Sequence, residues 1–416
     1  MNYFNYQGNE LYCEDVPVAR IAEEVGTPLY VYSASTIERH YRVFSEAFSE
    51  VDHLVCFSAK SNSNLAVLKL LGSMGAGADI VSGGELYRAL QAGIPPDRIV
   101  FSGVGKRDDE IRYALDTGIL MFNIESSEEL QSVQGIAREM DLKAPIAVRV
   151  NPDVDPKTHP YISTGLEKNK FGVPVTEALT LYRQAADMPN LDVVGIDCHI
   201  GSQLTSVHPF GEAVRRIMDL VGRLEAEGIS VRYVDVGGGL GIVYNNESPP
   251  LPSTYAETIL EAVGGGERTL IFEPGRVIVG NAGVLVARVL YNKKGATKNF
   301  VIVDAAMNDL IRPSLYDAYQ EIKPVTKTDR EAIVVDVVGP VCESADFLAR
   351  DHLLPRLGSG ELLAVMSAGA YGFPMASQYN SRPRCAEVMV RDSRFEVVRD
   401  RETYQDLIRG ERFFEG

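Results

Sequence analysis

The segment LVCFSAK, residues 54–60, is the first of eight short apolar runs that recur along the chain. The others are GADIVS (77–82), RIVFSG (98–103), ILMFNIES (119–126), PIAVRVNP (145–152), DVVGIDCHIG (192–201), VRYVDVGGG (231–239) and TLIFEPGR (269–276). Each run is continuously apolar, which is typical of a strand buried on both faces of a parallel sheet. The sequence therefore predicts eight parallel strands.

Amphipathic segments separate these runs, and several of them end in glycine. Examples are LAVLKLLGSM, GELYRALQAG, DEIRYALDTG, SSEELQSVQGIAREM and FGEAVRRIMDLVGRLEAEG, in which apolar residues recur every three or four positions. This spacing and the terminal glycines indicate helices. Eight strands alternating with helices over roughly 250 residues favour a closed (β/α)8 barrel of the TIM type. An open doubly wound sheet is the alternative.

The pattern changes after about residue 280. β-Branched runs separated by turn residues follow, in GVLVARVLYNKKGATKNFVIVDA, EAIVVDVVGPVC, ELLAVMSAGAY and AEVMVRD, and they predict an antiparallel β domain. The opening residues hold one helical stretch, PVARIAEEVG, and one strand-like stretch, PLYVYSAS, which is too little for a domain. We expect an N-terminal segment (1–33) that packs with the β domain (281–416), and a barrel at 34–280; a chain of 416 residues is long enough for two domains.

Composition narrows the classes of function. With 57 acidic and 41 basic residues the formal net charge is −16, which opposes binding to nucleic acid or to anionic membranes. The five cysteines are scattered without the paired spacing of a zinc or redox motif, so we expect reduced thiols and no metal. No segment has the pattern of a secretion signal or the length of a membrane span, which favours a cytoplasmic protein.

Polar residues stand at the ends of several predicted strands, where (β/α)8 barrels place their chemistry. Lys60 ends the first run, His199 the sixth, and Glu273 with Arg276 the eighth. A lysine is most often a solvated charge, but an amine in the mouth of a barrel can act as a nucleophile toward a carbonyl cofactor. His199 could equally be a buried core imidazole or a ring that stacks on a flat ligand, and Glu273 with Arg276 could be a simple ion pair.

The run DVGGGLG at 235–241 follows the seventh predicted strand. Its consecutive backbone N–H groups, free of side chains, suit the binding of a phosphate, with the hydroxyl of Ser202 as an added donor. A tight turn between strand and helix explains the glycines equally well. The run does not match G-x-G-x-x-G, which disfavours a dinucleotide.

These motifs together resemble the fold-type III pyridoxal-phosphate decarboxylases, whose barrel is similar to that of alanine racemase. The resemblance covers nearly the whole chain. It rests on FSAKSN (57–62), HIGSQ (199–203), GGGLG (237–241), EPGR (273–276), RPSLYDAY (312–319), GPVCESAD (339–346) and AYGFPMASQYNSRPR (370–384). The segment HPYISTGLEKNKFG (159–172) is characteristic of one branch of the family. Phe57, Ser61 and the segment FSGVGK (101–106) depart from the usual pattern.

The resemblance implies pyridoxal 5'-phosphate as cofactor and a homodimer with shared active sites. The implied cofactor-binding residues are Lys60, Asp79, His199, Ser202, Gly238, Gly239, Glu273, Gly275, Arg276 and Tyr371. The implied substrate-binding residues are Arg276, Arg312, Tyr316, Glu343 and Tyr371. The implied catalytic residues are Lys60, which holds the cofactor, His199, which stacks on its ring, and Cys342, which the other subunit contributes as proton donor.

These implied roles are chemically consistent. A carboxylate such as Glu273 at the ring nitrogen keeps that nitrogen protonated, which favours decarboxylation over racemisation. A thiol is mostly protonated at neutral pH and can supply a proton, although a free cysteine such as Cys342 is more often a small buried hydrophobe. A distal carboxylate on the substrate calls for a guanidinium, which Arg312 supplies.

The resemblance therefore implies decarboxylation of meso-2,6-diaminopimelate to L-lysine. Three alternatives stand beside it. One is a sister decarboxylase acting on ornithine, lysine, arginine or carboxynorspermidine. The second is a cofactor-binding protein without catalysis, although such single-domain proteins lack a C-terminal β domain. The third is a structural protein built on an idle barrel.

Overall fold

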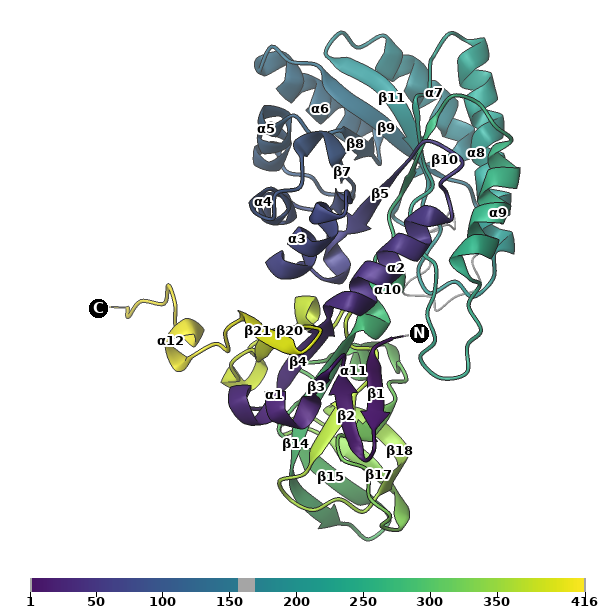
Figure 1. The fold of residues 1–416 in the computed structure, drawn as a ribbon. Helices are drawn as coiled ribbons and strands as arrows, with labels where there is room; N and C mark the ends of the chain where they lie inside the picture. Colours follow the sequence, from purple (N-terminus) through teal and green to yellow (C-terminus); the bar gives the residue numbers. More distant parts are fainter. Residues whose placement is uncertain (1, 156–168, 415–416) are drawn as a thin grey trace. The chain divides into compact units, whose positions relative to one another are not determined.

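The computed structural model describes residues 2–155 and 169–414, and the chain divides into two compact units (Figure 1). The barrel unit comprises Glu38–Val243 and Glu247–Val277, and the β unit comprises Met1–Ile37, Tyr244–Asn246 and Ile278–Gly416. Most of the branch-specific segment 159–172 lies outside the described residues.

Eight parallel strands close the barrel unit into a cylinder. They are β5 (His53–Ser58), β6 (Gly77–Ile80), β7 (Ile99–Phe101), β8 (Met121–Ile124), β9 (Ala144–Asn151), β11 (Leu191–Asp197), β12 (Tyr233–Asp235) and β13 (Thr269–Phe272). Each pairs with the next along the chain, and β13 pairs with β5, so the sheet has no open edge. The closed barrel is confirmed and the open sheet is excluded. A short strand, β10 (Val173–Pro174), adds to β9 from outside this ring.

One helix precedes the first barrel strand and one follows the last, and the helices between successive strands cover the outside of the barrel (Figure 1). They are α2 (Ala34–Glu46), α3 (Leu65–Ser73), α4 (Gly83–Gln91), α5 (Asp108–Thr117), α6 (Ser127–Glu139), α7 (Val175–Ala186), α8 (His208–Ala226), α9 (Pro252–Val263) and α10 (Arg276–Val279). Side-chain caps fix where several begin: Asn64, Ser82 and Ser126 each accept a backbone N–H of the first turn. No helix among the described residues is long and apolar enough to cross a membrane.

Apolar side chains fill part of the barrel interior. One buried cluster takes a residue or two from six of the eight strands: Leu54, Cys56, Val100, Met121, Ala147, Val194 and Ile271. Outside the sheet, Phe48 of the segment after α2 stacks on Phe272 of β13 with ring centroids 4.0 Å apart, and Tyr255 of α9 packs against both rings. These contacts hold the last barrel strand against α9 and the segment after α2.

The β unit is built on a second sheet in the order β18-β17-β15-β14-β4-β20-β21, to which β19 and β16 add. The strands are β4 (Leu29–Ser33), β14 (Gly283–Lys294), β15 (Asn299–Val303), β16 (Ile322–Pro324), β17 (Ala332–Val338), β18 (Phe347–Pro355), β19 (Leu362–Val365), β20 (Ala386–Arg391) and β21 (Arg394–Arg399). Pairings are antiparallel except β15–β17 and β4–β20, which are parallel. The expected antiparallel sheet is thus present, with two parallel pairs that the sequence did not indicate.

The N-terminal segment contributes more than one helix and one strand to this unit. β4 lies between β14 and β20, and all five of its residues are buried. Ahead of it stands a small three-stranded antiparallel sheet of β1 (Phe4–Gln7), β2 (Glu10–Cys13) and β3 (Val16–Pro17), followed by α1 (Val18–Val25). Two further short helices are α11 (Arg312–Tyr316) and α12 (Tyr404–Leu407).

Candidate active site

The inward face of the barrel changes from apolar to polar at the carboxyl ends of its strands. Successive inward positions of a strand are two residues apart. Beyond the apolar cluster, Cys56 is followed two residues later by Ser58, Val100 by Ser102, Met121 by Asn123, Ala147 by Arg149 and Ile271 by Glu273. All five polar side chains are buried. The strands therefore carry a layer of polar groups at the end where barrel enzymes place their chemistry.

Lys60 lies just beyond this layer. The first strand ends at Ser58, two residues earlier than the sequence predicted, and Lys60 sits in a single 3-10 turn, Ala59–Ser61. Its Nζ donates to Oδ2 of Asp79 at 2.8 Å, and the Ser58 hydroxyl donates to the same oxygen at 2.7 Å. Asp79 is fully buried in β6, whereas the Lys60 side chain is 36% exposed. The pair therefore holds the amine at a fixed place that remains accessible.

The glycine loop after β12 is shaped by close packing. Gly237 (φ +69°) and Gly239 (φ +114°) have backbone conformations that favour glycine. A Cβ on Gly238 would collide with the carbonyl oxygen of Glu273, and one on Gly239 with that of Gly201. The loops after three neighbouring strands can therefore meet only because these positions lack side chains.

His199 is fixed by the same loop. Its Nδ1 accepts the backbone N–H of Gly238 at 3.1 Å, so this nitrogen carries no proton. Burial lowers the pKa of His199 well below its usual value, and the nearby cations Arg149 and Lys60 lower it further. The ring is thus a neutral, flat imidazole with one orientation.

A buried cation stands beside the glycine loop. Arg276, at the start of α10, donates from Nη2 to the hydroxyl of Ser202 at 3.1 Å, and its Nε lies 3.4 Å from the same oxygen. Gly275 precedes it, and an added Cβ there would come within 2.9 Å of the Ser61 side chain. A guanidinium, a hydroxyl and close-packed glycine backbone form a donor set that suits a phosphate.

Three carboxyl groups gather inside the barrel. Oxygens of Asp197, Asp235 and Glu273 all lie within 4.8 Å of one another, and all three residues are buried. Burial raises the pKa of Glu273 well above its usual value, and the charges of Asp235, Asp79 and Asp197 add to the rise. Burial also raises the pKa of Asp235 to about 7. Like charges this close cannot all ionise, so this cluster retains protons at neutral pH.

Several polar residues of this layer were missed by the sequence analysis. Arg149 pairs with Glu125 at 3.1 Å and lies 3.9 Å from Asp197, so a buried cation balances part of the acidic cluster. Ser102 and Asn123 form hydrogen bonds to Glu273 and Asp235 of the acidic cluster, respectively. Each of these is a polar residue within or directly after one of the apolar runs. Polar residues at the ends of four strands were taken as candidates, and the same rule applied to all eight strands identifies these residues too.

The remaining candidates lie in the β unit. Arg312 begins α11, is buried, and donates from Nη1 to Oε1 of Gln320 at 2.8 Å while its guanidinium lies 4.6 Å from the ring centroid of Tyr244. Tyr316 ends the same short helix and is partly buried. Tyr371 is also partly buried and has a positive φ of 55°.

Cys342 and Glu343 follow β17 on an exposed loop. The backbone N–H of Cys342 donates to Oδ1 of Asn380 at 2.8 Å, and the Tyr379 hydroxyl donates to Glu343 at 2.7 Å. Buried Asp346 fixes the loop by accepting the backbone N–H of Val341. Cys342 is exposed and the other four cysteines are buried, so this thiol does not have the buried setting that is usual for a free cysteine.

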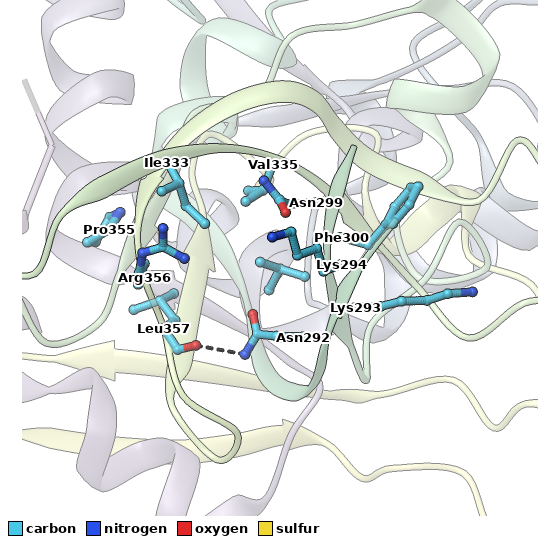
Figure 2. A pocket seen from close by; sticks show the side chains of 11 residues that line it. Asn292, Lys293, Lys294, Asn299, Phe300, Ile333, Val335, Pro355, Arg356 and Leu357 are labelled. Atoms are coloured by element: carbon cyan, nitrogen blue, oxygen red, sulfur yellow. Dashed lines mark hydrogen bonds between the residues drawn. The ribbon is translucent and has the colours of Figure 1, made fainter. Parts of the chain in front are cut away.

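A separate hollow of the β unit is shown in Figure 2 and holds about 300 Å³. It is lined by residues of β14, β15 and β17 and by the end of β18, including Lys294, Phe300 and Arg356. Asn292 closes one wall by donating to the carbonyl oxygen of Leu357 at 2.8 Å. None of the candidate residues lines this hollow, so the chemistry is placed elsewhere.

The barrel end fits pyridoxal phosphate in three respects. Lys60 offers an amine, and the set of Arg276, Ser202 and glycine backbone suits the phosphate. Among the described residues, the buried oxygens Asp79 Oδ1 and Asp197 Oδ1 have no hydrogen-bond partner. Unpartnered oxygens in an acidic interior suit a ligand that carries positive charge, as a protonated pyridine ring does.

Comparison with known proteins agrees with this fit. A family model described as pyridoxal-dependent decarboxylase, pyridoxal binding domain, matches residues 34–280. The chain is 54% identical to diaminopimelate decarboxylase of Pseudomonas aeruginosa over 411 residues, which is 99% of each chain. The structure of diaminopimelate decarboxylase from Helicobacter pylori complexed with L-lysine superposes with a TM-score of 0.91 at 47% identity, covering 94% of this chain and 98% of that one. That from M. jannaschii in complex with L-lysine gives a TM-score of 0.94 at 39% identity, with coverage of 99% and 98%.

Proposed function

We propose, from the premise that this chain belongs to the diaminopimelate decarboxylases, a family of pyridoxal-dependent enzymes, that it converts meso-2,6-diaminopimelate to L-lysine and carbon dioxide. The observation that carries the proposal is the joint placement of Lys60, His199, Glu273 and Arg276 at one end of the barrel, in a chain that matches named relatives along nearly its whole length. Its cofactor is pyridoxal 5'-phosphate. The bound cofactor supplies an electron sink for the pair of electrons that remains when carbon dioxide departs.

We assign the holding of the cofactor to the barrel residues. Lys60 binds it through its amine, with Asp79 fixing the position of Nζ at 2.8 Å. Arg276, Ser202 and the backbone of the glycine loop would bind the phosphate, and the imidazole of His199 would hold the ring in place. The full set is Lys60, Asp79, His199, Ser202, Gly238, Gly239, Glu273, Gly275 and Arg276, with Tyr371 as a further phosphate partner.

Glu273 holds a proton at the place assigned to the ring nitrogen. Its pKa is raised by burial and by the neighbouring carboxylates, so the carboxyl retains or shares a proton at neutral pH. With the cofactor bound, this proton could be shared with the ring nitrogen, and the carboxylate so formed would stabilise the protonated ring; a residue that cannot carry a negative charge would not. Glu273 therefore favours loss of carbon dioxide over racemisation.

Arg312 carries the choice of substrate. A guanidinium can bind a carboxylate through two parallel hydrogen bonds, and meso-diaminopimelate has a distal carboxylate that ornithine and lysine lack. We also assign Tyr316 and Arg276 to this carboxylate, and Glu343 and Tyr371 to the distal amino group. The buried contact with Gln320 and the ring of Tyr244 hold the Arg312 guanidinium in one orientation.

We assign the final proton transfer to Cys342. Its Sγ would give a proton to the carbon that has lost carbon dioxide, and solvent would restore the thiol. The exposed loop that carries Cys342 suits delivery to a site in a second copy of the chain, and we therefore propose a homodimer with shared active sites.

Two variants test the central assignment. Lys60→Ala is expected to abolish the visible absorbance band of the bound cofactor, and borohydride reduction of the native enzyme should leave the cofactor on the peptide that contains Lys60. A band that persists in Lys60→Ala, or a label on another peptide, would refute the assignment. Cys342→Ala should keep the band and lose most turnover; unchanged turnover removes Cys342 from the mechanism.

Relative turnover tests the substrate. We expect kcat/KM for meso-diaminopimelate to exceed that for ornithine, lysine, arginine and carboxynorspermidine by at least about 100-fold, which is the discrimination expected when a buried guanidinium is left without its carboxylate. Comparable or greater activity on one of the other substrates would establish the sister decarboxylase instead.

A further inference from the structure

A buried residue that carries no assigned role contacts Glu273, and a second buried residue contacts the first. Ser102 directly follows β7, and Asn123 lies in β8; they are 3% and 0% exposed. The Ser102 hydroxyl lies 3.2 Å from Oε1 of Glu273, and Nδ2 of Asn123 lies 3.0 Å from that hydroxyl. The same amide nitrogen is 3.5 Å from Oδ2 of Asp235.

The direction of these hydrogen bonds follows from the chemistry of the groups. An amide NH2 can only donate, so the Ser102 oxygen must accept from Asn123. A hydroxyl has one proton, and accepting from Asn123 leaves that proton for Glu273. The amide of Asn123 therefore fixes the Ser102 hydroxyl as a donor to Oε1 of Glu273.

A buried lysine holds the two residues in register. Nζ of Lys106 donates to the carbonyl oxygens of Gly103 and Asn123, each at 2.8 Å, and pairs with Glu129 at 2.6 Å. Gly103 is the neighbour of Ser102, and the second carbonyl belongs to Asn123 itself. The lysine thus ties the ends of β7 and β8 together where the two side chains emerge.

We propose that Ser102 and Asn123 are positioning residues that orient the Glu273 carboxyl toward the ring nitrogen of the bound cofactor. This inference rests on the role of Glu273 in the proposed function. With Oε1 held by Ser102 and the carboxyl also bonded to Asp235, Glu273 is restrained from two sides. Loss of one restraint lets the carboxyl turn away, so the ring nitrogen keeps its proton less well.

The test compares Ser102→Ala with Ser102→Thr, which keeps the hydroxyl. A hydrogen bond to a charged group has a net strength that corresponds to roughly a 10- to 100-fold change in an equilibrium or rate. We expect Ser102→Ala to lower kcat at least about tenfold with KM changed less than about threefold, and to shift the pH dependence of the cofactor's visible absorbance. Ser102→Thr should restore both.

Ser45→Ala is the matched control. It also removes a hydroxyl contact, here partly buried, at 2.9 Å from Nε2 of His53 at the other end of the barrel. It should leave the absorbance and kcat unchanged. A Ser102→Ala variant that loses thermal stability yet keeps its kcat and its absorbance titration would show a structural role only and would overturn the inference.

Glu273→Gln separates this inference from the proposed function. Glu273→Gln and the double variant Ser102→Ala/Glu273→Gln should be equally impaired if Ser102 acts through Glu273. A Glu273→Gln variant with native turnover and absorbance refutes the role of Glu273 itself. An impaired Glu273→Gln beside a native-like Ser102→Ala refutes only the positioning role, as does a double variant whose losses simply multiply.

Discussion

Removal of the Lys106 amine offers a quantitative test of how the barrel end is held. Its side chain is 1% exposed and that of its partner Glu129 is 8% exposed. In Lys106→Met, Glu129 becomes a buried carboxyl without its cation, and two buried carbonyl oxygens lose a donor. Breaking a buried ion pair on one side typically costs about 3–5 kcal/mol. At about 2–4 °C per kcal/mol for a unit of this size, the unfolding temperature should fall by roughly 6–20 °C.

The loss of stability in Lys106→Met should depend on pH in a defined direction. Burial raises the pKa of Glu129 above its usual value, while Lys106 lowers it. A carboxyl whose folded-state pKa is raised contributes stability below its unfolded pKa and loses that contribution as pH rises through the folded value. Without Lys106 the folded pKa rises further. The deficit of Lys106→Met relative to the native protein should therefore be larger at pH 8 than at pH 5.5.

Thermal unfolding of the cofactor-free protein, followed by far-ultraviolet circular dichroism at both pH values, measures these differences. Glu129→Gln in the Lys106→Met background should recover part of the loss at pH 8, because no buried charge remains. Arg183→Met removes an exposed ion pair with Glu227 and should shift the curve very little. The reasoning is refuted if Lys106→Met melts within about 2 °C of the native protein at pH 8.

Three further outcomes are expected. Gly238→Ala should weaken cofactor binding at least about tenfold in titrations of the cofactor-free protein, because its Cβ would collide with the carbonyl oxygen of Glu273. Gly222→Ala is the control and should leave cofactor binding unchanged, because a Cβ there meets no atom within 4 Å. The pKa of His199 is lowered in the folded protein, so its contribution to stability is present above the unfolded pKa of about 6.5 and is lost as pH falls. The melting temperatures of the native protein and of His199→Gln should therefore converge as pH is lowered from 7.5 to 5.5. Arg312→Lys should raise KM for diaminopimelate more than tenfold with a smaller effect on kcat, measured by carbon dioxide release, because a lysine lacks the planar fork; an unchanged KM would remove Arg312 from substrate binding.

Much of the barrel could be predicted from sequence because each strand is buried on both faces. That burial produces continuous apolar runs, and all eight mark real strands. The ends of the strands were predicted less accurately. The first strand was predicted to reach Lys60, but it ends at Ser58, where a single 3-10 turn begins. The parallel pairs in the β unit could not be foreseen, because β15 and β17 are separated along the chain by α11 and β16 and nothing in their sequences specifies the partner.

The candidate site was predicted less completely than the fold. Lys60 and the glycine loop are distinctive at the sequence level, and their local geometry agrees with a cofactor site. Ser102 and Asn123 are not distinctive, because a serine or asparagine after an apolar run looks like an ordinary strand end. The contact of Ser102 with Glu273 spans 171 positions of sequence and that of Asn123 with Asp235 spans 112, and only the closure of the barrel brings the ends of these strands to a common interior.

The position of β4 in the β unit constrains the order in which the parts of the chain can fold during synthesis. Tyr32, at the end of this early strand, bonds to Glu387, which is 355 residues later. At about 5–20 residues per second, a ribosome needs roughly 20–70 s to supply that partner. The barrel segment has been synthesised long before then and can fold first. During that time β4, whose five residues are buried in the finished protein, has one edge without its partner strand. A nascent chain stopped before residue 386 would therefore present that edge as a template for unwanted association.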